Sequence, residues 1–115
     1  MIIARISRLC LAAAALFAAV APAGAVETGM AGIHSWQKVG KKTCLVGHYH
    51  DGAGSGPSRK TAEMATIQSW ASFTDLEYGS SWADYRIAVS KTMTCGQEGA
   101  ARWSCQVSAI ACRPY

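Results

Sequence analysis

The chain has 115 residues, half of them hydrophobic, and its 11 basic and 7 acidic side chains give a formal net charge of +4. This length allows one small domain, which buries only about 60–65% of its unfolded surface and usually needs cross-links to be stable. The charge is small and dispersed, which argues against nucleic acid or an anionic membrane as the partner.

Residues 1–25 have the pattern of a secretory signal peptide. Arg5 and Arg8 precede an uncharged apolar run from Leu9 to Val20, and an A-x-A arrangement ends at Ala25. The run is shorter than the roughly 20 apolar residues of a spanning helix. We therefore expect cleavage near Ala25 and a periplasmic or secreted protein with no membrane span, an uncleaved anchor being the alternative. The remaining chain has nine basic and seven acidic residues, a net charge of +2.

The next part of the chain is predicted to hold an arm, a strand and a loop. Residues 26–41 contain several glycines, and we expect a flexible N-terminal arm that is anchored by Trp36. Residues 42–50 alternate as a strand does, which places His48 and His50 on one face. Residues 52–57 (GAGSGP) contain three glycines and a proline, and this composition predicts a loop.

A helix and two further strands are predicted to complete the domain. Ser58 is the predicted N-cap of a helix that runs to about Tyr78, where Gly79 ends it. Strands are predicted over residues 85–95 and 103–111, so the order is β-α-β-β. The sequence therefore predicts one small α+β domain over residues 42–115, in which a single helix packs on a three-stranded sheet. The predicted buried side of the helix consists of Met64, Ile67, Trp70, Ala71, Thr74 and Tyr78.

Four cysteines remain once the predicted signal peptide is removed. An even number in a short exported chain is typical of disulfides. Strand alternation places Cys95 and Cys105 on the inward faces of two strands joined by a hairpin, which leaves Cys44 to pair with Cys112. A zinc site is the alternative, but the spacings lack the C-x2-C pattern that such sites favour.

The C-terminal half carries an ordered series of aromatic residues, glycine and cysteines. The series is Trp70, Phe73, Tyr78-Gly79, Trp82-Ala83, Tyr85, Ala88 and Lys91, then Cys95, Cys105, Cys112 and Arg113. It resembles the pattern of a group of small exported, disulfide-containing proteins of alphaproteobacteria, notably rhizobia, whose function is unknown. Ala111 departs from that pattern, because proline is usual there. The resemblance implies an exported protein with disulfides, and it implies no particular activity.

Two histidines at the end of the predicted first strand indicate a candidate metal site. Residues i and i+2 of a strand project from one face about 6.5–7 Å apart. The imidazoles of His48 and His50 could therefore bind one Zn²⁺ or Cu²⁺ ion, with Asp51 or His34 as the third ligand. Metal binding needs neutral imidazole, so it should weaken as the pH falls through about 6.5. The alternative is two histidines that hydrogen-bond to loop backbone at the strand end.

Four side chains outside the predicted core form a candidate binding surface. Phe73 and Trp82 fall outside the predicted inward faces, and Arg59 and Lys60 lie beside the glycine-rich segment. This surface favours a non-enzymatic exported binding domain that acts on an envelope or extracellular protein or glycan.

Two other functions are weighed against this one. A metal-binding protein that uses His48 and His50 is the first alternative. A small periplasmic hydrolase is the second, and it would need Glu63 or Asp75 in a cleft beside another carboxylate. The glycine-rich segment lacks the spacing of a phosphate-binding loop, which argues against a nucleotide enzyme.

Overall fold

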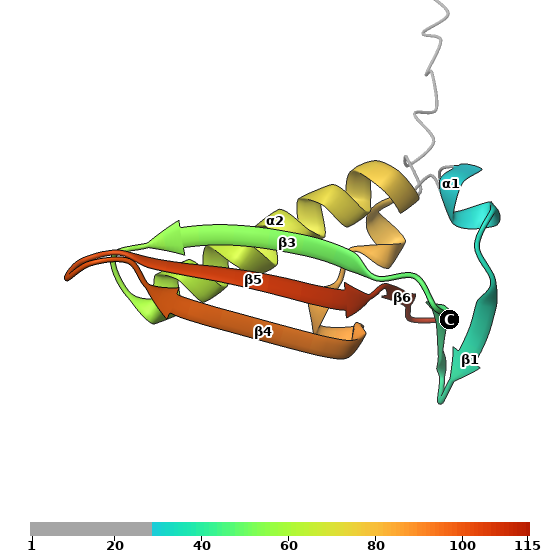
Figure 1. Cartoon of the computed structure of the whole chain (residues 1–115). Coiled ribbons are helices and arrows are strands. Elements are labelled where there is room, and N and C mark those ends of the chain that lie inside the picture. Colours follow the sequence, from blue (N-terminus) through green and yellow to red (C-terminus); the bar gives the residue numbers. More distant parts are fainter. Residues whose placement is uncertain (1–28) are drawn as a thin grey trace, which may run out of the picture.

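The computed structural model describes residues 29–115, and it confirms a small α+β fold with two disulfides (Figure 1). The predicted signal peptide lies outside the described residues. In chain order, the elements are α1 (Gly29–Gly32), β1 (Trp36–Val39), β2 (Lys42–Leu45), β3 (His50–Gly56), α2 (Arg59–Tyr78), the 3-10 turns η1 (Ser80–Trp82) and η2 (Tyr85–Ile87), β4 (Val89–Gln97), β5 (Trp103–Ile110) and β6 (Cys112–Arg113).

The described strands form two antiparallel sheets, where the sequence predicted one. Strands β3-β5-β4 make a long sheet against α2, and β1-β2-β6 make a small sheet at one end (Figure 1). The predicted strand over residues 42–50 is wrong, because the chain turns at Val46 and Gly47, and Gly47 has a φ of 71°. The two halves of that segment therefore join different sheets. Residues 85–87, predicted as strand, form η2.

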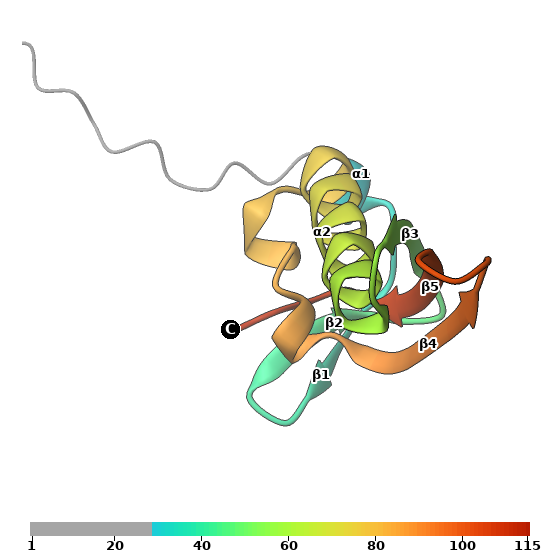
Figure 2. The same ribbon diagram turned by 90° about the vertical axis from the view of Figure 1, so that its left-hand side faces the viewer.

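The glycine-rich segment is a strand, so the prediction of a loop over residues 52–57 is wrong. A Cβ atom on Gly52 would lie 2.7 Å from backbone atoms of α2, and a Cβ on Gly54 would lie 2.6 Å from them. The glycines occur at every second position of β3, and Gly52, Gly54 and Gly56 all face the helix. Figure 2 shows α2 end-on against β3. Glycine usually weakens a strand, but here it permits the close approach of another backbone.

Helix α2 begins and ends where the sequence predicted. The Thr61 N–H donates to the Ser58 side chain at 3.2 Å, and the Ser58 N–H donates to the Thr61 hydroxyl at 3.0 Å. This reciprocal cap satisfies donors that would otherwise be unpaired at the helix start. Gly79 ends the helix with a φ of 100°, and its N–H donates to the Asp75 carbonyl.

The buried face of α2 is narrower than the predicted apolar side. Every fourth residue is buried, and Met64, predicted to face inward, is 61% exposed. Small and β-branched residues occupy much of this face because the backbone of β3 lies so close to the helix. The buried residues are Ala62, Thr66, Trp70, Thr74 and Tyr78.

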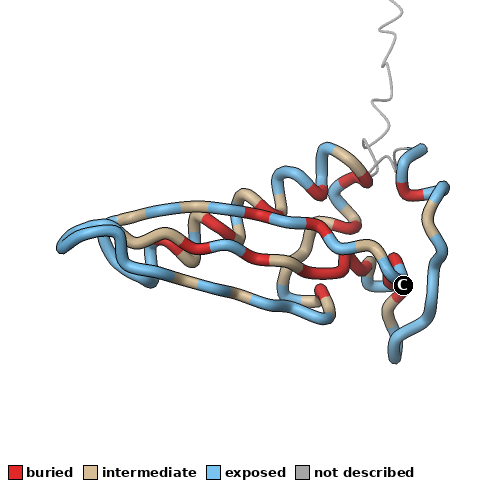
Figure 3. Tube along the Cα trace, in the orientation of Figure 1, coloured by how far each residue is buried: buried red, intermediate tan, exposed pale blue. Residues whose placement is uncertain are grey.

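The main core lies between α2 and the long sheet and continues beneath η1 (Figure 3). Trp70, Tyr78 and Trp82 are fully buried in it. The prediction that Trp82 is a surface residue is wrong, because η1 folds its ring inward, 5.4 Å from the ring of Trp36.

The segment predicted as a flexible arm contains α1 and β1, and the Trp36 indole N–H donates to the Ala31 carbonyl at 2.8 Å. The indole thus anchors this segment as expected.

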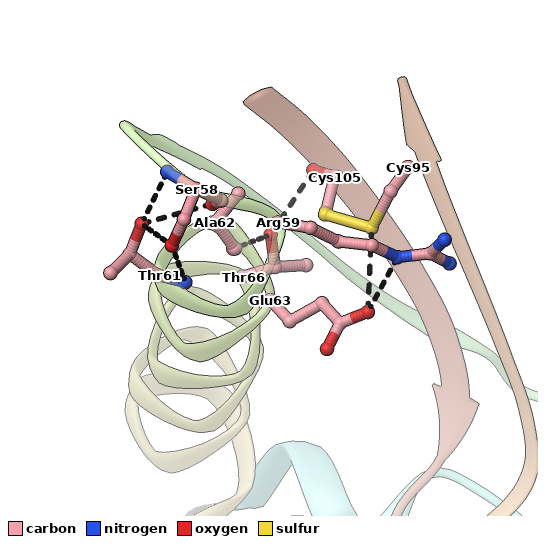
Figure 4. The surroundings of a disulfide bond; sticks show 8 residues. All are labelled: Ser58, Arg59, Thr61, Ala62, Glu63, Thr66, Cys95 and Cys105. Carbon is pink, nitrogen blue, oxygen red and sulfur yellow. Dashed lines mark hydrogen bonds and ion pairs between the residues drawn. A yellow bond between two sulfur atoms is a disulfide. The ribbon is translucent and has the colours of Figure 1, made fainter. Parts of the chain in front are cut away.

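Both predicted disulfides are confirmed. Cys95 lies opposite Cys105 in the β4–β5 ladder, and Cys44 lies opposite Cys112 in the small sheet. Figure 4 shows the first disulfide near the start of α2, where Glu63 accepts a hydrogen bond from Arg59. Two disulfides fit the oxidising conditions met by exported proteins. Within residues 29–115, no helix is long and apolar enough to cross a membrane.

Candidate metal centre

Three side chains from separate segments converge near the C-terminal end of α2. His34 follows α1, His48 precedes β3, and Glu77 lies in the last turn of α2. One ligand atom from each lies within 4.8 Å of the other two, and all three residues are half-buried. Two imidazoles and a carboxylate form a ligand set that suits divalent transition metals.

The backbone brings the two histidine-bearing loops together. The Val46 N–H donates to the Ser35 carbonyl at 2.9 Å, which ties the turn before His48 to the residue after His34. The two imidazole rings stack, with centroids 4.1 Å apart and planes 25° from parallel. Figure 1 shows α1 at the same end of the molecule as the C-terminal end of α2, which carries Glu77.

The spacing of the donor atoms is close to that of a metal site. Donors about 2.0–2.1 Å from a tetrahedral Zn²⁺ ion lie roughly 3.3 Å from one another. Side-chain movements of less than about 1 Å per donor would therefore close the three atoms around an ion. Three protein ligands leave one tetrahedral position for water or a further ligand.

His50 is an outer partner of Glu77. The Thr74 hydroxyl donates to the Trp70 carbonyl at 2.7 Å, so it must accept its hydrogen bond from Nδ1 of His50, 3.0 Å away. The other ring nitrogen of His50, Nε2, contacts the Glu77 carboxylate. His50 is buried, and its contact holds the carboxylate in place, as outer partners of metal ligands commonly do.

The surroundings of His48 favour its neutral form. Burial, followed by the nearby His34 imidazole, lowers the pKa of His48 below the usual value, although Glu77 opposes the shift. Neutral imidazole is the form that binds metal. Tyr78 lies beside the cluster, where its hydroxyl is 3.4 Å from Nε2 of His34, and burial raises its pKa to about 12.

The structure changes the ligand set that the sequence indicated. The rings of His48 and His50 lie on the same side, with centroids 6.2 Å apart, as expected, but His48 precedes β3 and only His48 belongs to the cluster. Asp51 is exposed and follows His50 in β3, so its side chain points to the opposite face of the sheet. Of the two third ligands considered, His34 is in the cluster and Asp51 is not.

Glu77 is the member of the cluster that the sequence did not indicate. No local spacing links it to a histidine. One signal was present, since Glu77 is three residues after Thr74 and next to Tyr78, both predicted to face inward. That signal places Glu77 beside the buried face of α2, but it does not say which loop it meets.

The other predicted site residues lie apart from this cluster. Phe73 is 58% exposed, as predicted, and its ring centroid is 5.3 Å from that of His50. Arg59 and Lys60 are exposed in the first turn of α2, and Arg59 pairs with Glu63. Asp75 is exposed, and Glu63 pairs with Arg59 and does not line the groove described below, so neither lies in a cleft beside another described carboxylate, as a hydrolase of the kind considered would need.

Comparison of the chain with known protein families, with curated proteins and with solved structures gives no match. The function is therefore inferred from the geometry of the described residues.

Proposed function

We propose that this protein is exported and binds a divalent transition-metal ion, Zn²⁺ or Cu²⁺, through His34, His48 and Glu77. The convergence of their ligand atoms to within 4.8 Å of one another is the observation that carries the proposal. Metal binding was the first alternative in the sequence analysis, whereas the favoured function was a binding domain for an envelope or extracellular protein or glycan. Glu77 replaces His50 and Asp51 as a ligand, and His50 contacts the Glu77 carboxylate as an outer partner.

Isothermal titration calorimetry of the metal-free protein with Zn²⁺ and with Cu²⁺ tests the proposal. We expect one ion per chain. His34→Ala, His48→Ala and Glu77→Gln should each lower the affinity more than His50→Asn does, and loss of an outer partner typically costs about 10–100-fold. Cu²⁺ should bind more tightly than Zn²⁺ to any such site, so the affinity order alone does not identify the physiological metal.

Asp51→Asn is the matched control. It also removes a carboxylate close to the histidines in sequence, but Asp51 points to the other face of the sheet. The affinity of the Asp51→Asn variant for metal should equal that of the wild type. Equal binding by the wild type and the three ligand variants would refute the proposal, as would an Asp51→Asn effect as large as that of Glu77→Gln.

A further inference from the structure

The face of the long sheet that points away from α2 carries mostly polar side chains around the middle of its three strands. Because glycines of β3 face the helix, the residues between them face outward, together with their partners on β5 and β4. Two neighbouring rows run across the sheet in this way: Asp51, Ser108 and Thr92, then Ala53, Gln106 and Thr94. These rows contain no large apolar side chain, so this part of the face does not belong to the hydrophobic core.

A groove of about 840 Å³ includes this outer face and extends past the edge of β3 to α2. Two aromatic side chains line it, Tyr49 before β3 and Phe73 on α2, and they are 52% and 58% exposed. His48 and Glu77 also line the groove, so the groove reaches the candidate metal centre.

The charges of the groove restrict its ligand. Neither lysine nor arginine is among the described residues that line it, so the lining lacks the permanently charged cations that would favour an anionic ligand. Asp51 and Glu77 are the acidic residues in the lining, and Glu77 is paired with His50. The remaining polar side chains are hydroxyls, an amide and the imidazoles of His48 and His50, all of which can donate and accept hydrogen bonds.

We propose that this groove binds a neutral oligosaccharide. Exposed aromatic rings present flat apolar faces to the C–H groups of sugar rings, while hydroxyl and amide side chains exchange hydrogen bonds with sugar hydroxyls. Ser108, Thr92, Gln106 and Thr94 supply those groups on adjacent strands about 4.8 Å apart. The proposal goes beyond metal binding and does not require it, because the outer face carries no ligand of the proposed metal centre.

Nuclear magnetic resonance titration of the full exported chain, kept free of metal with a chelator, tests this proposal. The probes are chitotetraose, cellotetraose and maltotetraose at millimolar concentration, with spermidine as a cationic probe of the acidic residues. At least one saccharide should shift the backbone amide signals of Asp51, Thr92 and Gln106. Phe73→Ala should weaken that binding by about three- to tenfold, which is the range for loss of one aromatic contact.

Leu76→Ala is the matched control for Phe73→Ala. Leu76 is an apolar residue on the same helix, is 78% exposed and does not line the groove. Its removal should leave the affinity unchanged. Gln106→Ala tests the outer face itself and should also weaken binding. The proposal is overturned if no saccharide shifts these signals, if only spermidine does, or if Leu76→Ala and Phe73→Ala have the same effect. Because metal is absent throughout, these outcomes are separate from those of the metal titration.

Discussion

Replacement of Gly54 by alanine tests the close contact between β3 and α2. The added Cβ would lie 2.6 Å from the Ala65 carbonyl carbon and the Thr66 nitrogen, whereas ordinary van der Waals contact begins at 3.4 Å. Both atoms belong to the helix backbone and cannot rotate away. The helix must therefore move by about 0.8 Å at this point, which disturbs the packing of the whole buried face.

The expected cost follows from two opposing effects. Overpacking of this kind typically destabilises a protein by about 1–3 kcal/mol. Alanine also restricts the unfolded chain, which by itself stabilises by about 0.4–1 kcal/mol. We therefore expect Gly54→Ala to lower the free energy of unfolding by about 1–2 kcal/mol, which for a domain of this size lowers the melting temperature by about 4–16 °C.

Gly96→Ala is the control for this prediction. Gly96 lies in β4 of the same sheet, is exposed, and has no atom within 4 Å of the position that its Cβ would take. The same change should there be neutral or stabilise by up to about 1 kcal/mol. Urea unfolding followed by circular dichroism, with both disulfides intact, measures the difference. Equal stabilities of the two variants would refute the close packing of β3 against α2.

Two further predictions concern the disulfides and Tyr78. The Cys44–Cys112 disulfide closes a longer loop than the Cys95–Cys105 disulfide, with sequence separations of 68 and 10. Replacing the first pair by alanines should therefore lower the free energy of unfolding, measured with urea, by about 4 kcal/mol, and replacing the second pair by about 3 kcal/mol. The reverse order would contradict the loop argument. Since the pKa of Tyr78 is raised to about 12, its contribution to stability is fully present below pH 10 and is lost progressively between about 10 and 12. Tyr78→Phe should lessen this alkaline loss of stability, and an unchanged pH profile would count against the raised pKa.

Features set by local sequence could be predicted, and features set by tertiary packing could not. The helix from Arg59 to Tyr78 follows from its Ser58 cap and from Gly79, and the Cys95–Cys105 disulfide follows from strand alternation, with Cys44–Cys112 as the pair that remains. Both depend on residues close in sequence or on a two-residue period.

The role of the glycines in β3 depends instead on a partner that the sequence does not reveal. Gly52 and Gly54 are weak strand formers on their own, so a loop was the natural prediction. The nearby backbone of α2 makes glycine the residue that fits there. Trp82 was misassigned for a similar reason, because the 3-10 turn that buries it has no periodic pattern.

The candidate metal site shows the same limit. His48 could be singled out from the sequence, but the loop between β2 and β3 turns its ring toward His34. Glu77 joins them because the last turn of α2 ends beside these loops. The site therefore depends on the placement of three elements, and no motif in the sequence encodes it.

The most direct test of the metal proposal is a crystal structure of the protein grown with Zn²⁺, with anomalous diffraction recorded at the zinc absorption edge. The proposal predicts one strong anomalous peak at about 2.0–2.2 Å from a nitrogen of His34, a nitrogen of His48 and an oxygen of Glu77. His50 should remain hydrogen-bonded to Thr74. A peak at Asp51, or no peak between the two histidines, would contradict the proposal.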